Sequence, residues 1–227
     1  MKKPIFSIKK LYFSNKTSKI LAINKFDFHR GAMYLFSGPM GAGKSTLMKI
    51  LAKSQKITSS LVFYEGEDIG LIKSSVYNKE VTFLSQNNKR PWLGGNVRNY
   101  MIKKIKSSIG SNFDQIFKKI CNSMKISNHL LEANISLISE GEFRWVLLSI
   151  SIALDSKVLI IDYLDKSLDS NRRIILNRIL KRKSSHDGVT IIASSYTPDF
   201  FKMSTSVFIK MDKGRISQVR SLSYKTK

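Results

Sequence analysis

Short apolar runs along the chain alternate with longer segments in which apolar residues return every three or four positions. The short runs predict buried strands, and the longer spacing predicts amphipathic helices. Strands are predicted over residues 5–13, 20–28, 34–37, 61–64, 81–84, 158–161, 189–193 and 207–209. Helices are predicted over 47–52, most of 94–129, 141–154 and 172–183. This alternation favours an α/β domain with a mostly parallel sheet and a helical insertion in its middle.

A glycine-rich loop lies between the strand predicted at 34–37 and the helix predicted at 47–52. It reads Gly38-Pro39-Met40-Gly41-Ala42-Gly43-Lys44-Ser45-Thr46, which is a full phosphate-binding loop in its required setting. In such a loop the backbone N–H groups wrap the phosphates, the Lys44 amine reaches the β- and γ-phosphates, and the Ser45 hydroxyl binds Mg²⁺. The setting and the Lys-Ser pair argue against a chance glycine-rich turn. We therefore expect residues 38–46, the phosphate loop, to bind a nucleoside triphosphate.

Five further segments follow in an order that resembles the nucleotide-binding subunits of ABC transporters. They are Val81–Gln86, Ser139-Glu140-Gly141-Glu142, Asp162 at the end of an apolar strand, Lys166-Ser167-Leu168-Asp169 and Met211–Ile216. The family has Ser-Gly-Gly-Gln where this chain has residues 139–142. With the phosphate loop, these segments extend the resemblance over nearly the whole chain.

The resemblance implies a fold and a division of the chain. The fold is that of a P-loop NTPase, with a mostly parallel sheet flanked by helices, a small antiparallel β part and a helical insertion. On this basis residues 1–227 are expected to form one ATP-binding domain. Its core would span about 1–90 and 155–227, and a helical subdomain would span about 91–154.

The same resemblance assigns roles around a bound ATP. Asp162, Ser45 and Gln86 would hold Mg²⁺, and Gln86 would also sense the γ-phosphate. Ser139 and Gly141 open a helix, so their N–H groups would face the γ-phosphate of an ATP held by the opposite subunit.

Adenine would stack on an aromatic residue near the end of the first strand. Tyr12 is our candidate, and Phe13 is the alternative. Packing into the core is an equally good role for either ring.

Two residues depart from the family where the attacking water would lie. Tyr163 replaces the glutamate that polarises this water, and Tyr196 replaces the histidine that follows the late strand. Tyrosine is neutral at pH 7 and cannot act as a carboxylate base. Asp165 is a weak candidate for a substitute base, because it lies three residues from the usual position. We therefore expect weak or absent hydrolysis.

Residues 139–142 depart from the family as well. A carboxylate at Glu140 or Glu142 would weaken binding of a γ-phosphate unless it points away or pairs with Lys or Arg. The alternative is a surface glutamate that the helix dipole favours.

The charge balance is strongly basic, with 39 Lys and Arg against 16 Asp and Glu, a net +23. Such a charge favours contact with nucleic acid, an anionic membrane or an acidic partner, although a simply solvated Lys-rich surface explains it too. The helix predicted at 172–183 carries several of these cations, which either form a solvated face or contact lipid headgroups or an acidic partner. Trp92 is either an exposed anchor for a membrane partner or a buried residue of the insertion.

The cysteine and histidine content limits which disulfides and metal sites the chain can form. Cys121 is the only cysteine, so an internal disulfide is excluded, and His29, His129 and His186 are too scattered to predict a metal site. The N-terminus lacks the apolar stretch of a secretory signal, and no apolar run approaches the roughly 20 residues that cross a bilayer.

The resemblance implies a function that these observations allow. The chain would be the ATP-binding subunit of an ABC transporter, peripheral on the cytoplasmic or organelle-matrix face of a membrane. It would work with a transmembrane permease subunit and form a homodimer, or a heterodimer with a second ATP-binding subunit. Among the branches of the family, the short insertion and the Ser139-x-Gly141 segment are similar to the ATP-binding subunit of haem-exporter-type cytochrome c maturation systems. A non-transport member acting on nucleic acid or ribosomes is the alternative, and 227 residues are too few for the known types of that class.

Overall fold

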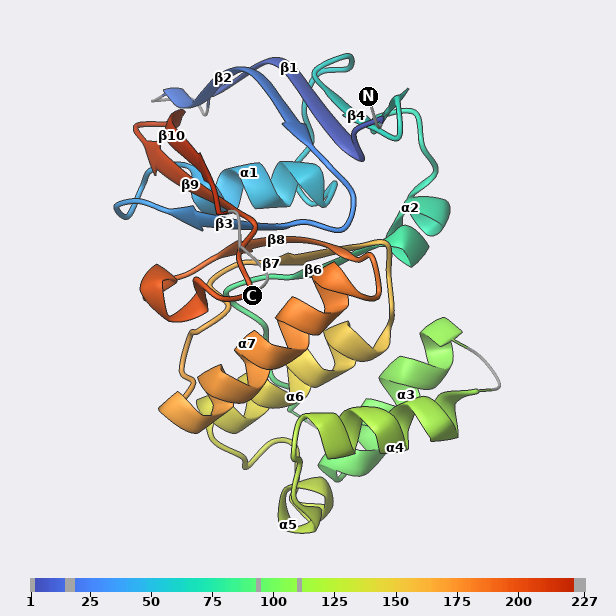
Figure 1. The fold of residues 1–227 in the computed structure, drawn as a ribbon. Helices are drawn as coiled ribbons and strands as arrows, with labels where there is room; N and C mark the ends of the chain where they lie inside the picture. The colour runs from blue at the N-terminus through green and yellow to red at the C-terminus, as the bar shows by residue number, and fades with distance from the viewer. Residues whose placement is uncertain (1–2, 15–18, 93–94, 110–111, 223–227) are drawn as a thin grey trace.

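The computed structural model describes residues 3–14, 19–92, 95–109 and 112–222, and its layers are drawn in Figure 1. The strands are β1 (Phe6–Ser14), β2 (Lys19–Phe28), β3 (Met33–Ser37), β4 (Val62–Tyr64), β5 (Glu67–Asp68), β6 (Val81–Leu84), β7 (Val158–Ile161), β8 (Thr190–Ser194), β9 (Val207–Asp212) and β10 (Arg215–Ser221). The helices are α1 (Lys44–Leu51), α2 (Ser74–Glu80), α3 (Val97–Ile109), α4 (Phe113–Ser123), α5 (Asn128–Glu132), α6 (Glu140–Ala153), α7 (Ser170–Ser185) and the 3₁₀ turn η1 (Pro198–Phe201).

The central sheet has the strand order β10-β9-β3-β8-β7-β6, and only β10 runs antiparallel to its neighbour. Every residue of β7 and β8 is buried, as expected of parallel strands that are covered on both faces. Successive residues of β7 alternate between the faces, with Leu159 and Ile161 in one core and Val158 and Ile160 in the other. Because β6, β7, β8, β3 and β9 run parallel, their carboxyl ends lie at one edge of the sheet, where Asp162 follows β7.

A second, antiparallel sheet of order β2-β1-β4-β5 lies on the far side of α1 (Figure 1). Its inner side chains and the α1 side chains fill the core between the two sheets. Aromatic rings dominate this core, and Phe28 packs edge-on against both Phe6 and Tyr34. Such edge-to-face pairs each stabilise a core by about 0.5–1.5 kcal/mol beyond the area they bury.

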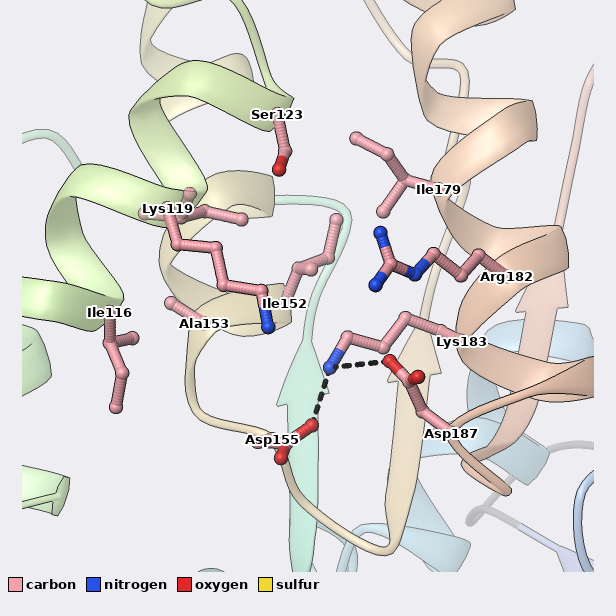
Figure 2. A pocket seen from close by; sticks show the side chains of 11 residues that line it. Ile116, Lys119, Ser123, Ile152, Ala153, Asp155, Ile179, Arg182, Lys183 and Asp187 are labelled. Atoms are coloured by element: carbon pink, nitrogen blue, oxygen red, sulfur yellow. Dashed lines mark hydrogen bonds and ion pairs between the residues drawn. The ribbon is translucent and has the colours of Figure 1, made fainter.

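The other face of the central sheet carries α6 and α7, with α3, α4 and α5 beyond α6 (Figure 1). Trp145 of α6 is fully buried, and its indole N–H donates to the Met124 carbonyl at 3.1 Å, which joins α6 to the end of α4. Helices α4, α6 and α7 also border a cleft, shown in Figure 2.

The α/β fold, the predicted strands and the three longest predicted helical segments are confirmed, with boundaries that move by a few residues. Residues 94 and 110–111 of the segment predicted as helical lie outside the described residues. Helix α2 and strands β5 and β10 were not predicted. Helix α2 buries only Tyr77, β5 has two residues, and β10 is exposed along most of its length, so none of them gives a clear apolar pattern. Within the described residues, no helix is long and apolar enough to cross a bilayer.

Candidate functional site

The phosphate loop connects β3 to α1, and its glycines are required by close backbone contacts. At Gly38, where φ is +140°, a Cβ would lie 2.1 Å from the Met211 carbonyl oxygen. At Gly43, where φ is +94°, a Cβ would lie 2.7 Å from a Leu21 methyl carbon. A side chain at either position would therefore displace the loop, apart from any effect on a bound phosphate.

Lys44 lies inside this loop and is only 3% exposed. Its amine donates hydrogen bonds to the carbonyls of Gly38 at 2.7 Å and Pro39 at 2.9 Å. Burial lowers the pKa of Lys44, and the nearby Asp162 carboxylate opposes that shift. A partly desolvated ammonium inside a ring of backbone groups suits a polyphosphate, because the low local dielectric strengthens its attraction for an anion.

Asp162 follows β7 directly and is 1% exposed. One carboxylate oxygen accepts a hydrogen bond from the Ser194 hydroxyl at 2.9 Å, which fixes the side chain against the end of β8. Its charge interacts with Lys44 across the site, while Ser45 lies half-buried at the start of α1. The carboxylate and the hydroxyl supply oxygen ligands of the type that Mg²⁺ prefers.

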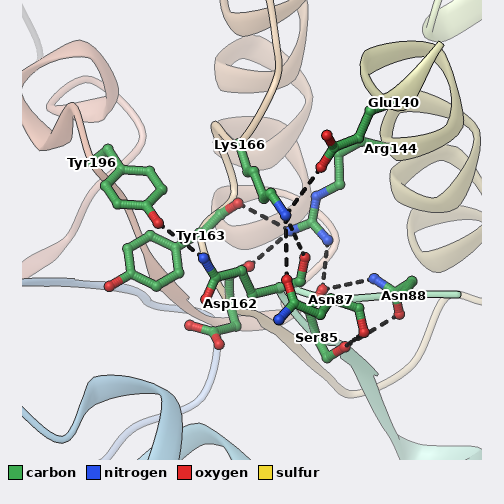
Figure 3. A network of polar contacts seen from close by, with 10 residues as sticks. Ser85, Asn87, Asn88, Glu140, Arg144, Asp162, Tyr163, Lys166 and Tyr196 are labelled. Atoms are coloured by element: carbon green, nitrogen blue, oxygen red, sulfur yellow. Dashed lines mark hydrogen bonds and ion pairs between the residues drawn. The ribbon is translucent and has the colours of Figure 1, made fainter. Parts of the chain in front are cut away.

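Tyr163 and Tyr196 stack on each other, with ring centroids 4.0 Å apart and planes inclined by 20° (Figure 3). Tyr163 is buried, and Tyr196 covers it from the solvent side with 54% of its own surface exposed. The Lys44 amine lies 5.5 Å from the Tyr163 ring centroid. Burial raises the pKa of Tyr163, and Tyr196, Asp162 and Asp165 raise it further. The phenol is therefore neutral at pH 7.

Gln86 is the second residue after β6, and its side chain contacts the same tyrosine pair. Its side-chain amide donates a hydrogen bond to the Tyr196 hydroxyl at 2.9 Å. The structure thus brings together Gln86, Tyr163 and Tyr196, three positions that sequence reasoning placed near the γ-phosphate.

Asp165 is 2% exposed and is occupied by donors from the segment after β8. It accepts hydrogen bonds from the Ser195 hydroxyl at 2.8 Å, the Tyr196 N–H at 3.0 Å, and the Thr197 N–H and hydroxyl at 2.8 and 2.6 Å. These four bonds hold the backbone that carries Tyr196. Asp165 therefore positions the loop of residues 195–197 after β8.

Arg144 is a site residue that sequence reasoning missed. It projects from α6, is buried, and donates to the carbonyls of Ser85 at 2.6 Å, Asp162 at 2.8 Å and Tyr163 at 3.0 Å. Burial lowers its pKa to about 10. One guanidinium therefore ties the end of β6 to the end of β7 (Figure 3). The available signal was one arginine within the apolar run from Phe143 to Leu148.

Ser139 begins α6 as its N-cap. The Ser139 hydroxyl accepts from the Glu142 N–H at 3.2 Å, and the Ser139 N–H donates to the Glu142 carboxylate at 2.9 Å, which completes a capping box. The Glu142 carboxylate accepts hydrogen bonds from the Ser139 hydroxyl at 2.7 Å and from the Ser139 N–H, and these two bonds lower the pKa of Glu142. Glu142 is therefore used within its own helix end.

Glu140 and Gly141 both contact the segment after β7. The Glu140 carboxylate pairs with the Lys166 amine at 3.0 Å. This is the pairing with Lys or Arg that lets a carboxylate lie near a γ-phosphate without weakening its binding. A Cβ at Gly141 would lie 2.5 Å from the Ser167 carbonyl oxygen. The glycine is therefore needed for the close approach of α6 to residues 166–169.

The two aromatic candidates for adenine stacking differ in exposure. Tyr12 on β1 is exposed, donates a hydrogen bond to the Asn24 side chain, and lines a surface hollow with Arg215 and Ile216 of β10. Phe13 is half-buried and packs on the core between the sheets. Of the two rings, Tyr12 is the one that a ligand can reach.

Trp92 is 90% exposed, so the alternative that it is buried in the helical insertion is wrong. Within the described part of the chain, no group of three or more His, Cys, Asp or Glu residues is placed to hold a metal ion.

Comparison with known sequences matches residues 21–163 to the family model described as ABC transporter. The probable iron export ATP-binding protein FetA of Escherichia coli is 26% identical over 197 residues, covering 86% of each chain. The Fe(3+) ions import ATP-binding protein FbpC of Pasteurella multocida is 26% identical over 208 residues, covering 88% of this chain and 57% of that relative. The chain thus spans little more than half of the second relative.

Comparison of structures gives the same architecture. An ATP-binding cassette solved as a dimer in a post-hydrolysis state with ADP and Pi has a TM-score of 0.82 at 16% identity, covering 96% of this chain and 99% of that one. The protein cbiO1 from Clostridium perfringens, part of the ABC transporter complex cbiONQ, has a TM-score of 0.78 at 19% identity, covering 97% of this chain and 89% of that one. At these identities the likeness establishes the fold, which includes the two-sheet arrangement around α1.

Proposed function

Because this chain belongs to the ABC transporter family, we propose that it is a transporter's ATP-binding subunit that holds ATP and Mg²⁺ but hydrolyses ATP slowly or not at all. The observation that supports slow hydrolysis is the stack of Tyr163 on Tyr196. These rings occupy the positions where the resemblance to the family leads us to expect a glutamate and a histidine.

ATP would be held by the phosphate loop. The backbone of residues 38–46 and the Lys44 amine would bind the phosphates, while Ser45, Asp162 and Gln86 would face Mg²⁺. Bound Mg²⁺ would neutralise phosphate charge. The buried Asp162 and the glycine-dependent loop support this assignment, since both are already held in place by protein contacts.

Slow hydrolysis follows from the chemistry of the tyrosine pair. A water molecule that attacks the γ-phosphate needs a base to orient it and accept its proton, and a positioned base contributes about 10²–10⁴ in rate. Tyr163 is neutral and buried, and the Asp165 carboxylate is engaged by four donors. A family rate on the order of 1 s⁻¹ would therefore fall to about 10⁻² s⁻¹ or less.

The experiment compares wild type with Lys44→Ala in two measurements. Thermal stability with ATP and Mg²⁺ should rise in wild type and stay nearly unchanged in Lys44→Ala, because the variant loses the buried cation of the loop. Phosphate release should be close to background in both. Equal thermal shifts would refute ATP binding by the loop, and turnover near 1 s⁻¹ in wild type alone would refute slow hydrolysis.

A dimer would complete the arrangement, as in the solved cassette dimer that resembles this chain. Ser139 and Gly141 at the start of α6 would face an ATP held by the opposite subunit. If that subunit is a second, intact ATP-binding chain, its own site stays competent while this chain's site does not.

The exposed Trp92 supports contact with a membrane permease. Leu137, also exposed, lies in a neighbouring segment, which Arg90 joins to the Trp92 loop by a hydrogen bond to the Ser136 carbonyl. A large aromatic beside a leucine and an arginine is the composition of an interface anchor. The chain would then lie on the cytoplasmic or organelle-matrix face of the membrane, where its basic α7 would also meet anionic lipid.

Affinity purification from native membranes tests this placement. Wild type should retain a membrane protein that Trp92→Ala loses, and the identity of that protein reveals the cargo. Iron export or import, as in the names of the relatives, and haem export for cytochrome c maturation are the cargo classes to distinguish. Recovery of ribosomes or RNA in place of a membrane protein would favour the non-transport alternative.

A further inference from the structure

A cleft of about 140 Å³ lies at the edge of the central sheet opposite the phosphate loop, between α4, the end of α6 and α7 (Figure 2). Asp155, at the start of the connection to β7, lines this cleft, whereas Asp162 in the ATP site follows the other end of the same strand. Much of its lining is apolar, from Ile116, Ile120, Ile152, Ala153 and Ile179. The cleft is therefore separate from the site described above.

Charged side chains surround this apolar lining, and they are not balanced. Lys183 pairs with Asp155 and, at 3.3 Å, with Asp187, so one cation already engages both carboxylates of the cleft. Lys119 from α4 and Arg182 from α7 extend into the same space (Figure 2). Neither side chain has an ion-pair or hydrogen-bond partner among the residues that the structure describes. Two unpaired cations on opposite walls thus face one apolar surface.

We propose that this cleft binds a small carboxylate that carries a short apolar chain. The Arg182 guanidinium matches a carboxylate in two-pronged geometry, and the Lys119 amine adds a second positive charge. The isoleucines and Ala153 exclude water from the apolar chain. Because a cavity of roughly 150 Å³ accommodates a molecule the size of benzene, the ligand has about six to ten non-hydrogen atoms.

Such a ligand would join two parts of the fold. Lys119 belongs to α4 in the helical group, and Arg182 belongs to α7 against the central sheet. Helix α6 lies between them. A carboxylate held by both side chains therefore stabilises α4 against α7, and this stabilisation gives a readout that does not depend on ATP.

The experiment titrates the full chain with hexanoate, followed by thermal unfolding and by ligand-observed NMR. Hexanol and inorganic phosphate, at matched ionic strength, separate the contributions of the apolar chain and the charge. Hexanoate should give a saturable rise in melting temperature, and the other two probes should give little. Lys119→Gln combined with Arg182→Gln should weaken hexanoate binding at least tenfold, and both positions are exposed, so the fold should be retained.

The matched control is Lys118→Gln combined with Arg178→Gln, which removes the same charge from the same two helices outside the cleft. Its hexanoate affinity should equal that of wild type. The proposal is overturned if the control pair loses as much affinity as the cleft pair, or if phosphate binds as tightly as hexanoate. It is also overturned if hexanoate shows no saturable binding below about 10 mM.

Discussion

The Gln86 side-chain amide donates a hydrogen bond to the Tyr196 hydroxyl at 2.9 Å, across the end of β7. Gln86 follows β6 and Tyr196 follows β8, so the bond spans three strands of the central sheet. Tyr196 in turn covers Tyr163 at the end of β7. The three loops after β6, β7 and β8, which border the proposed ATP site, are thereby connected through the Tyr196 side chain.

Replacing both tyrosines with the residues of the family should recover hydrolysis. Tyr163→Glu supplies a carboxylate base, and Tyr196→His supplies a donor to the γ-phosphate. Phosphate release by the double variant should exceed wild type by at least about tenfold. Each single variant should recover less, and their effects need not add, because both residues act on one transition state.

The control for this recovery is the same double variant with Lys44→Ala, which should return the rate to background. A double variant no faster than wild type, while still binding ATP, would contradict a deficit confined to these two positions.

Asp165→Asn should destabilise the fold by about 2–3 kcal/mol. In wild type the two carboxylate oxygens accept four hydrogen bonds, and in the variant an NH₂ group replaces one of these oxygens and leaves some of the donors without an acceptor. Urea unfolding measures this loss. Asp199→Asn is the matched control, since Asp199 lies on the exposed surface of η1 and pairs only with Lys202 in the ion pairs described. It should change stability by less than about 0.5 kcal/mol. Normal stability with abolished turnover in Asp165→Asn would identify Asp165 as a catalytic base after all.

The sequence predicts the fold because local patterns determine its elements. A glycine-rich loop between a strand and a helix predicted the phosphate loop, apolar runs predicted β7 and β8, and apolar residues three or four positions apart predicted most of α6. The contacts that define the site come from residues distant in the chain. Asp165 meets Thr197 across 32 positions and Arg144 meets Ser85 across 59, and no spacing rule connects such pairs before the sheet forms.

Glu142 should make stability depend on pH. Its pKa in the folded chain is lowered by the Ser139 hydroxyl and N–H, so the unfolded chain binds the proton more tightly. The contribution of Glu142 is therefore complete above its ordinary pKa of about 4.3 and is lost as pH falls through the lowered folded value. Urea unfolding at pH 6 and below pH 4 measures it.

Two variants separate charge from capping at this position. Glu142→Gln keeps an acceptor for the Ser139 N–H but has no charge. It should therefore remove the pH dependence and, at pH 7, lose the part of the stability that wild type loses in acid. Glu142→Ala removes the acceptor as well and should cost about 1 kcal/mol at pH 7. Identical pH profiles for wild type and Glu142→Gln would rule out this role.

The last prediction concerns a partner subunit and rests on the proposed dimer. Ser139→Arg places a long cation at the N-terminus of α6, where the proposed dimer brings the opposite subunit's ATP. In a complex with an intact second ATP-binding chain, this bulk should block closure over the partner's competent site. ATPase activity of the complex should then fall at least about tenfold, a barrier increase of about 1.4 kcal/mol. Binding of ATP by this chain's own phosphate loop should not change, because Ser139 lies outside residues 38–46.

The matched control for that variant is Ser127→Arg. Ser127 is also an N-cap serine, and its side chain accepts a hydrogen bond from the Leu130 N–H at the start of α5. Both variants lose a cap and gain an arginine, so both should lose roughly 0.5–2 kcal/mol of stability. Only Ser139→Arg should reduce the ATPase of the complex, since only that position faces the opposite nucleotide in the proposed dimer. Equal loss of activity in the two variants would trace the effect to stability, and unchanged turnover in Ser139→Arg would refute the arrangement across the dimer.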